Sequence, residues 1–195
     1  MAQSMRSRKT GGVLVREDSH IFKSQWGWVG IAETAEGISQ IVFPLSSRAK
    51  VLAVLFGSGR GPLRVPSTAA TSPRLHKAKR QLLEYFAGTR KTFDLQLDLT
   101  RGTGFQRRVW EALRMVPFGQ LRSYQGLAGL VGGKRYARAV GGAVGANPLP
   151  IVIPCHRVVA QDGSLGGFSC GLPAKRRLLE REGTLSRLRR AARDA

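Results

Sequence analysis

A largely apolar run from Ile151 to Val159 surrounds the sequence Pro154-Cys155-His156-Arg157. A continuous apolar run of this length is typical of a buried strand, and the exit of such a strand would hold Cys155 inside the fold. The segment therefore predicts a thiol beside an imidazole in apolar surroundings, and it constrains the fold more than any other stretch of the chain.

The chemical question at this segment is whether Cys155 can react. Burial raises the pKa of a thiol, so Cys155 would be inert unless a neighbouring base could take its proton, and His156 is the obvious candidate. Adjacent side chains on a strand point to opposite faces, so the two could hydrogen-bond directly only if the chain turns between them; a relay through one water fits equally well. The alternative, a core cysteine beside a surface histidine, is the more common situation for an isolated Cys-His pair.

The charge of the chain points to a polyanionic partner. Its 195 residues include 32 Lys and Arg against 12 Asp and Glu, which gives a net charge of +20 at pH 7 and a pI near 11.6. This excess favours nucleic acid through counterion release, although a generally basic proteome or a membrane-surface protein would share it. No segment approaches the roughly 20 apolar residues of a membrane span, and Met1 to Thr10 lacks the apolar core of a signal peptide. We therefore expect an intracellular protein, in the cytoplasm of a bacterium or archaeon or in the nucleus of a eukaryote.

The hydrophobic fraction, 42%, suffices for one good core or two small ones. Possible metal ligands are scarce: the chain has two cysteines, Cys155 and Cys170, and three histidines, His20, His76 and His156. They form no Cys-x-x-Cys or similar cluster, and two cysteines do not make a disulfide framework. We expect neither a metal nor a cofactor.

The periodicity of the chain predicts an α+β fold. We expect a flexible basic arm (residues 1–20), a small α/β scaffold domain (21–100), a mainly helical domain that carries the chemistry (101–185) and a basic tail (186–195). Within the scaffold domain, apolar runs at 26–33 and 38–44 indicate a hairpin, 47–55 and 74–86 indicate helices, 57–73 indicates a long loop, and Phe93, Leu95, Leu97 and Leu99 alternate as in a strand.

The second domain has the pattern of a helix-turn-helix. A helix is expected from Phe105 to Met115, with Trp110 in the core beside its apolar stripe. Ser123 is a good N-cap for a following short helix, and Gly132-Gly133 turns the chain into a second helix from Lys134 to Gly145.

This second helix is unusually slim. A helix with side chains is about 10 to 12 Å across and the minor groove of DNA about 6 Å wide, so helices normally enter the major groove. Small side chains relax that limit, and Arg138 projects alone among Ala137, Ala139, Gly141, Gly142 and Ala143. The pattern suits close approach to DNA with one cationic wedge. A tightly packed internal helix is the alternative, but a lone buried arginine would be costly there.

From Gly102 to Gly183 the chain resembles the O6-alkylguanine-DNA alkyltransferase family. The resemblance is carried by several ordered motifs at family spacing: residues 102–110 (GTGFQRRVW), 118–124 (FGQLRSY), 137–143 (ARAVGGA), Asn147-Pro148, the Pro-Cys-His-Arg-Val segment and Glu182. It implies a DNA repair protein that flips O6-alkylguanine out of duplex DNA and transfers the alkyl group irreversibly to Cys155. It also implies a monomer that binds double-stranded DNA through the minor groove.

The resemblance further implies roles for individual residues. His156 takes the thiol proton, Glu182 orients the imidazole, and Asn147 braces the turn and links the active-site hydrogen bonds. Arg138 replaces the extruded nucleotide and Tyr124 contacts its phosphate backbone, with Gln106 and Gln125 as weaker candidates for DNA contact. The guanine edge is expected against the backbone of Cys155 and Val158, with Ser169 and the Lys175 region near O6.

One position departs from the family pattern, because Cys170 stands where glycine is frequent. Its bulk leads us to expect a narrower pocket that disfavours large O6 adducts relative to methyl. Three other functions compete with the repair reading: an alkyltransferase-like protein that binds damage without chemistry, a cysteine hydrolase, and a plain DNA-binding protein with an inert thiol. The presence of Cys155 argues against the first, and the adjacency of Cys and His against the second.

Overall fold

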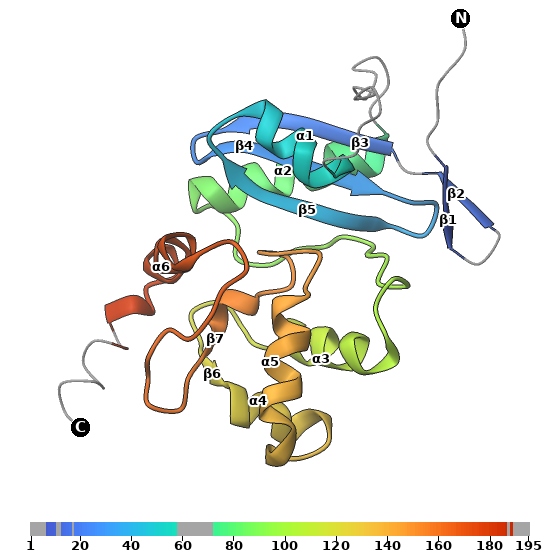
Figure 1. The fold of residues 1–195 in the computed structure, drawn as a ribbon. Helices are drawn as coiled ribbons and strands as arrows, with labels where there is room; N and C mark the ends of the chain where they lie inside the picture. Colours follow the sequence, from blue (N-terminus) through green and yellow to red (C-terminus); the bar gives the residue numbers. More distant parts are fainter. Residues whose placement is uncertain (1–6, 11–12, 17, 58–71, 187, 189–195) are drawn as a thin grey trace, which may run out of the picture. The chain divides into compact units, whose positions relative to one another are not determined.

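The computed structural model describes residues 7–10, 13–16, 18–57, 72–186 and 188. The chain divides between Leu99 and Thr100 into two compact units. The strands and helices confirm the predicted α+β class (Figure 1).

The first unit is built on an antiparallel sheet with the strand order β3-β4-β5, formed by β3 (Asp18–Ser24), β4 (Gly27–Glu33) and β5 (Ile38–Leu45). The hairpin predicted at 26–44 is thus present as β4 and β5. A separate hairpin, β1 (Ser7–Thr10) with β2 (Val13–Arg16), lies in the segment where we expected an arm without regular structure, and β3 begins there too. Of that arm, residues 1–6, 11–12 and 17 lie outside the described residues.

Two helices cover opposite faces of this sheet. Helix α1 (Arg48–Phe56) is capped by Ser47 and lies so close over β4 that a Cβ on Gly30 would come within 2.6 Å of the Val51 side chain. Helix α2 (Pro73–Ala87) faces the side of β3 that carries His20 and Phe22, with the Lys79 ammonium 5.7 Å from the Phe22 ring centroid. Because side chains alternate along a strand, these contacts put α1 and α2 on opposite sides.

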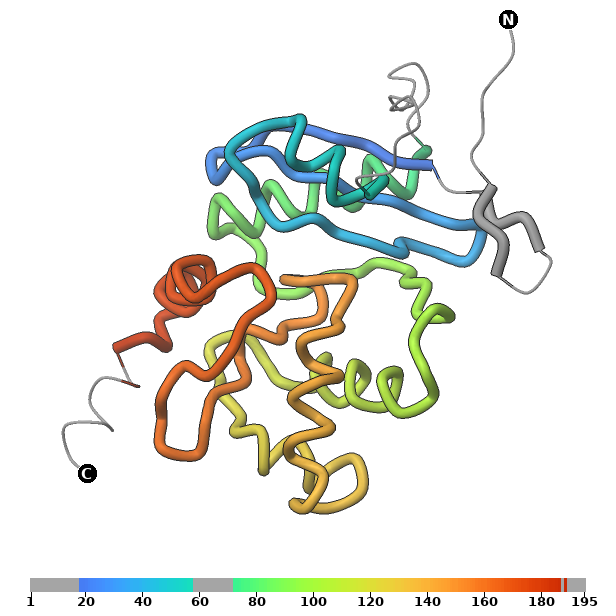
Figure 2. The backbone as a smooth tube through the Cα atoms, in the orientation of Figure 1, coloured from blue at the N-terminus to red at the C-terminus, as the bar shows by residue number. Residues whose placement is uncertain are grey.

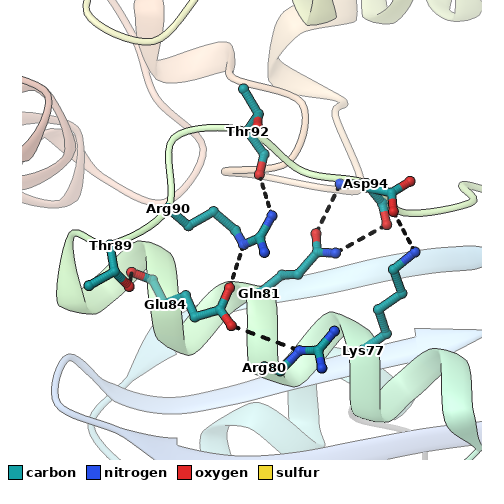
Figure 3. Close-up of polar contacts among 8 residues, drawn as sticks. All are labelled: Lys77, Arg80, Gln81, Glu84, Thr89, Arg90, Thr92 and Asp94. Carbon is teal, nitrogen blue, oxygen red and sulfur yellow. Dashed lines mark hydrogen bonds and ion pairs between the residues drawn. The ribbon is translucent and has the colours of Figure 1, made fainter.

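The segment after α2 is held by side chains rather than by strand pairing. Gln81 donates to and accepts from the backbone of Asp94 (3.2 and 3.0 Å), while Arg90 lies 2.6 Å from Glu84 (Figure 3). The alternating run from Phe93 to Leu99 forms no named strand, and only Leu97 bridges to Ile38 of β5. The alternating apolar pattern of this segment therefore reflects its contacts with α2 and with the edge of the sheet, not strand pairing.

The second unit is mainly helical. It contains α3 (Gly104–Arg114), α4 (Tyr124–Val131), α5 (Ala137–Gly145) and α6 (Leu172–Arg181), the 3₁₀ turns η1 (Lys134–Tyr136) and η2 (Cys155–Arg157), and the short parallel strands β6 (Arg122–Ser123) and β7 (Val158–Val159). The predicted helix-turn-helix is confirmed as α4 and α5, with Ser123 as the N-cap of α4 and Gly132 and Gly133 at positive φ between them.

The core of this unit lies between α3, α4 and α5. Trp110 is 3% exposed and its indole N–H donates to the carbonyl of Ala143 (2.8 Å), which confirms it as a core residue. A Cβ on Gly102 would collide with the same indole, so glycine is needed there. Among the described residues, no helix has both the length and the apolar character to cross a membrane.

Candidate active site

The apolar run around Cys155 is a turn, and the prediction of a strand from Ile151 onward is wrong. Ile151 has a φ of 78°, and the Ile153 N–H donates to the carbonyl of Leu149 (2.8 Å), so the chain folds back on itself before η2 (Figure 2). Only Val158–Val159 pairs as a strand. An apolar run reports burial, and a turn can be buried if its polar backbone groups find partners.

Asn147 supplies those partners. Its side-chain oxygen accepts from the Leu149 N–H (3.0 Å), and its NH₂ group donates to the carbonyl of Ile153 (2.8 Å) and to Cys155 Sγ (3.0 Å). The side chain thus braces the turn and contacts the sulfur at the same time.

The Cys155 thiol is almost fully buried. The residue is 2% exposed, and burial raises the pKa of its thiol to about 11. The hydrogen bond from Asn147 lowers this pKa, Cys170 raises it further, and the positive charge of Lys175 lowers it. At neutral pH the sulfur is therefore protonated, and a nearby base is needed for it to act as a nucleophile.

His156 and Glu182 form a buried pair. His156 Nε2 lies 2.8 Å from Glu182 Oε1, and both side chains have no exposed surface. Burial lowers the pKa of His156, and this outweighs the opposite effect of the carboxylate. Since an ionised carboxylate can only accept, Nε2 carries the proton and Nδ1 keeps a lone pair; within the described part of the chain Nδ1 has no hydrogen-bond partner. Nδ1 is thus the nitrogen that can accept a proton.

Arg157 completes this network, and the sequence reasoning did not include it. Its guanidinium donates to both oxygens of Glu182 (2.9 Å each) and to the carbonyl of Val116 (2.6 Å). Burial would raise the pKa of Glu182, but the hydrogen bonds and charges of His156 and Arg157 lower it to about 2. The signal available in the sequence was a charged residue inside an apolar run, which requires a buried partner of opposite charge.

Lys175 is fully buried near the start of α6. Its ammonium donates to the carbonyls of Val158, Leu165 and Gly167. Burial lowers its pKa to about 8, against the raising effect of Cys155. An ammonium has three N–H bonds, and these three carbonyls use all of them. The structure thus gives the Lys175 ammonium three backbone partners, in the region that we expected near the substrate O6.

Tyr124 and Lys175 meet on one carbonyl. The Tyr124 hydroxyl donates to Gly167 O (3.4 Å), and a Cβ on Gly166 would lie 2.9 Å from the Tyr124 ring. Burial and the nearby Cys155 raise the pKa of Tyr124. The start of α4, the loop before α6 and the buried lysine are therefore joined at Gly167, next to the exposed Ser169.

Comparison with known proteins decides the family. The family model described as "6-O-methylguanine DNA methyltransferase, DNA binding domain" matches residues 104–184. A methylated-DNA–protein-cysteine methyltransferase of Methanosarcina acetivorans is 36% identical over 165 residues, which cover 84% of this chain and 97% of the relative. The chain belongs to the methylated-DNA–protein-cysteine methyltransferase family.

Other methyltransferase relatives agree with this assignment. The Mycobacterium bovis protein is 52% identical over 102 residues, and that match spans 61% of its length and 52% of this chain. A crystal structure of Mycobacterium tuberculosis O6-methylguanine methyltransferase superposes with a TM-score of 0.67 at 36% identity, over 88% of this chain and 94% of that one. A second structure of the M. tuberculosis protein, in complex with DNA, gives 0.67 at 37% identity, over 87% of this chain and 94% of that one.

The second helix of the helix-turn-helix, α5, has one buried and one open face. Val140, Ala143 and Val144 are buried, whereas Arg138, Ala139 and Gly142 are exposed. A Cβ on Gly142 would meet nothing within 4 Å. The small residues of this open face therefore do not serve close packing inside the described unit.

The remaining candidate residues are less closely tied to the site. Gln106 caps α3: its side-chain oxygen accepts from the Thr103 N–H (2.9 Å). Gln125 is exposed at the start of α4. Ser169 Oγ lies 3.9 Å from Cys170 Sγ, and Cys170 is half-buried. The structure thus brings seven of the predicted residues into one connected set: Cys155, Asn147, His156, Glu182, Val158, Lys175 and Tyr124. It leaves Gln106, Gln125, Arg138 and Ser169 outside this set.

Proposed function

We propose that this protein repairs DNA by moving an alkyl group from O6 of guanine to its own Cys155 in a single-turnover reaction. The observation that carries the proposal is a buried thiol hydrogen-bonded to Asn147, next to a histidine whose proton is fixed on Nε2 by an ionised glutamate. Family membership supports the same reaction.

The proton path follows from the tautomer of His156. Its free Nδ1 accepts the proton of the Cys155 thiol through one water, which fits a nitrogen and a sulfur that share no direct hydrogen bond among the described residues. Glu182 stabilises the imidazolium that forms, and Arg157 keeps Glu182 ionised. Asn147 stabilises the developing thiolate through its N–H donor.

The transfer is a displacement at the alkyl carbon. The Cys155 sulfur forms the new S–C bond while the C–O6 bond breaks, and guanine leaves with the electron pair and takes up a proton. The product is a thioether, which water does not cleave under mild conditions. Each molecule therefore acts once, without metal or cofactor among the groups that move.

The base is proposed to lie against the backbone of Cys155 and Val158, with Ser169 near O6 and Tyr124 beside the phosphate of the extruded nucleotide. Extrusion is required because O6 of a stacked guanine cannot reach a buried sulfur. The raised pKa of Tyr124 caused by burial and by Cys155 is consistent with a phenol close to the reacting sulfur.

The partner is proposed to be duplex DNA, bound by a monomer through the minor groove with the open face of α5. From Ala112 to Gln161 the sequence has six Lys and Arg and no Asp or Glu. Arg138 is the wedge that fills the place of the extruded nucleotide, with Gln106 and Gln125 as backbone contacts. Because the proposed substrate is genomic DNA, the protein would act inside the cell. The first unit is proposed to serve as a scaffold.

Intact-mass spectrometry tests the reaction. After incubation with duplex DNA containing one O6-methylguanine, the protein should gain a single methyl group, located on Cys155 by peptide mapping. Cys155→Ala should abolish the gain, whereas the matched thiol deletion Cys170→Ala should retain it. DNA binding without any mass change would favour a damage-binding protein or an inert thiol, and the absence of both DNA binding and a mass change would favour a hydrolase.

A further inference from the structure

The connection between α4 and α5 presents an aromatic side chain to solvent. Tyr136 is the N-cap residue of α5 and is 39% exposed. The Arg135 guanidinium lies 5.0 Å from the centroid of its ring and donates to its hydroxyl (3.1 Å). Arg135 and Tyr136 thus form a stacked and hydrogen-bonded unit at the start of the helix that carries Arg138.

Among the described residues, no acidic side chain pairs with the charge of Arg135. No Asp or Glu occurs between Ala112 and Gln161, and Arg135 has no ion pair among the residues that the structure describes. Of its five N–H bonds, the described part of the chain uses one, in the contact with Tyr136. The Tyr136 ring lies against Gly132, where a Cβ would come 3.5 Å from two ring carbons. Both Arg135 and Tyr136 are exposed, so the guanidinium is accessible to a partner.

We propose that Arg135 and Tyr136 form a second DNA contact beside Arg138, in which Arg135 binds a backbone phosphate and Tyr136 holds the guanidinium in place. The inference rests on the proposed function, because duplex DNA is the partner. Planar guanidinium groups bind phosphate with two N–H bonds, and stacking on an aromatic ring limits the freedom lost on binding. The pair contributes to docking of the duplex and takes no part in alkyl transfer.

Binding and reaction can be measured separately. DNA affinity is measured by fluorescence anisotropy with an O6-methylguanine duplex over a range of NaCl concentrations, in a Cys155→Ser background that prevents turnover. The state of the active site is measured by the rate at which the Cys155 protein takes the methyl group from free O6-methylguanine, a reaction without DNA. Arg176→Ala, which removes an exposed arginine from α6, is the charge-matched control.

Arg135→Ala should weaken DNA binding about tenfold, as expected for loss of one charged hydrogen-bonded contact. It should also reduce the slope of log K against log [salt] by about one, the value for one phosphate. Tyr136→Ala should act in the same direction and Tyr136→Phe less, since phenylalanine keeps the stacking. In each variant the loss in affinity should exceed any change in the free-base rate.

The proposal is overturned if Arg135→Ala and Tyr136→Ala bind DNA as Arg176→Ala does, because net charge alone would then account for the effect. Failure of the proposed function looks different: the Cys155 protein would gain no methyl group from damaged DNA, whatever the affinities of these variants.

Discussion

At the scale of single residues, the buried charges around His156 give the clearest expectation for stability. Glu182→Gln leaves the guanidinium of Arg157 buried with a neutral partner, and breaking a buried ion pair in this way costs about 3 to 5 kcal/mol. We expect the free energy of unfolding, measured by urea denaturation at pH 7, to fall by that amount. Glu180→Gln, an exposed acid on the same helix, is the control and should stay within about 0.5 kcal/mol of the wild type.

The same substitution has a defined pH dependence. The pKa of Glu182 is lowered from 4.5 to about 2, so its carboxylate stabilises the folded state above pH 4.5 and loses this effect as the pH falls toward 2. The difference in stability between wild type and Glu182→Gln should therefore shrink over that window. A difference that stays constant down to pH 2 would mean that the ion pair contributes nothing.

If the three N–H bonds of Lys175 all donate to backbone carbonyls, as in the structure, Lys175 affects the substrate only through the backbone. The carbonyl of Val158, whose backbone we propose to lie against the guanine edge, is one of its partners and is an acceptor for the 2-amino group of the base. Lys175→Met should then slow transfer from O6-methylguanine in duplex DNA about tenfold more than from O6-methylhypoxanthine, which lacks that amino group. The rates are measured by quenched-flow and intact mass. Equal losses on both lesions would instead indicate a lysine that donates to O6.

At the scale of secondary structure, the sequence predicts elements that local rules govern. Ser123 caps α4 as expected, because a serine before an apolar periodic run satisfies the first free N–H groups of a helix. Ser47 caps α1 in the same way, although only a helix over 47–55 was predicted there. Trp110 was correctly placed in the core by its position beside an apolar stripe.

The elements that were missed depend on contacts distant in sequence. The turn before Cys155 requires Asn147 to satisfy its backbone, so hydropathy alone reads it as a strand. The partner of Arg157 is 25 positions away at the end of α6, and the three acceptors of Lys175 come from two different segments. The family resemblance named most of the site residues, but Arg157 and the backbone role of Lys175 emerged only from the folded arrangement.

Helix α5 offers a test that separates stability from DNA binding. Gly142 is exposed with open space around its Cα, and glycine in a helix costs about 1 kcal/mol relative to alanine or leucine. Gly142→Leu should therefore raise the free energy of unfolding by about 0.5 to 1 kcal/mol. It should weaken binding to duplex DNA at least about tenfold, because the added bulk prevents close approach to a groove about 6 Å wide.

The matched control for this substitution is Gly129→Leu on α4, another exposed helical glycine with nothing within 4 Å of its missing Cβ. It should stabilise the protein to the same degree and leave the affinity for DNA unchanged in an anisotropy titration. If Gly142→Leu instead destabilises the fold, the small residues of α5 serve internal packing, and the proposed reading of the helix loses its physical basis.

At the scale of the whole molecule, the net charge of +20 and the proposed binding of a flipped base should contribute to DNA affinity in separable ways. Phosphate contacts are independent of sequence and make log K fall with log [salt] by about 0.9 per phosphate, whereas a flipped base in a buried pocket adds affinity that salt hardly changes. With three to five exposed cations of the acid-free segment on phosphates, we expect a slope of about −3 to −5. In a Cys155→Ser background, plots of log K against log [salt] for methylated and unmethylated duplexes should be parallel lines. The vertical offset between them would be the added affinity for the lesion. Slopes that differ by two or more would mean that lesion recognition recruits additional phosphate contacts, and that the protein encloses damaged DNA differently from intact DNA.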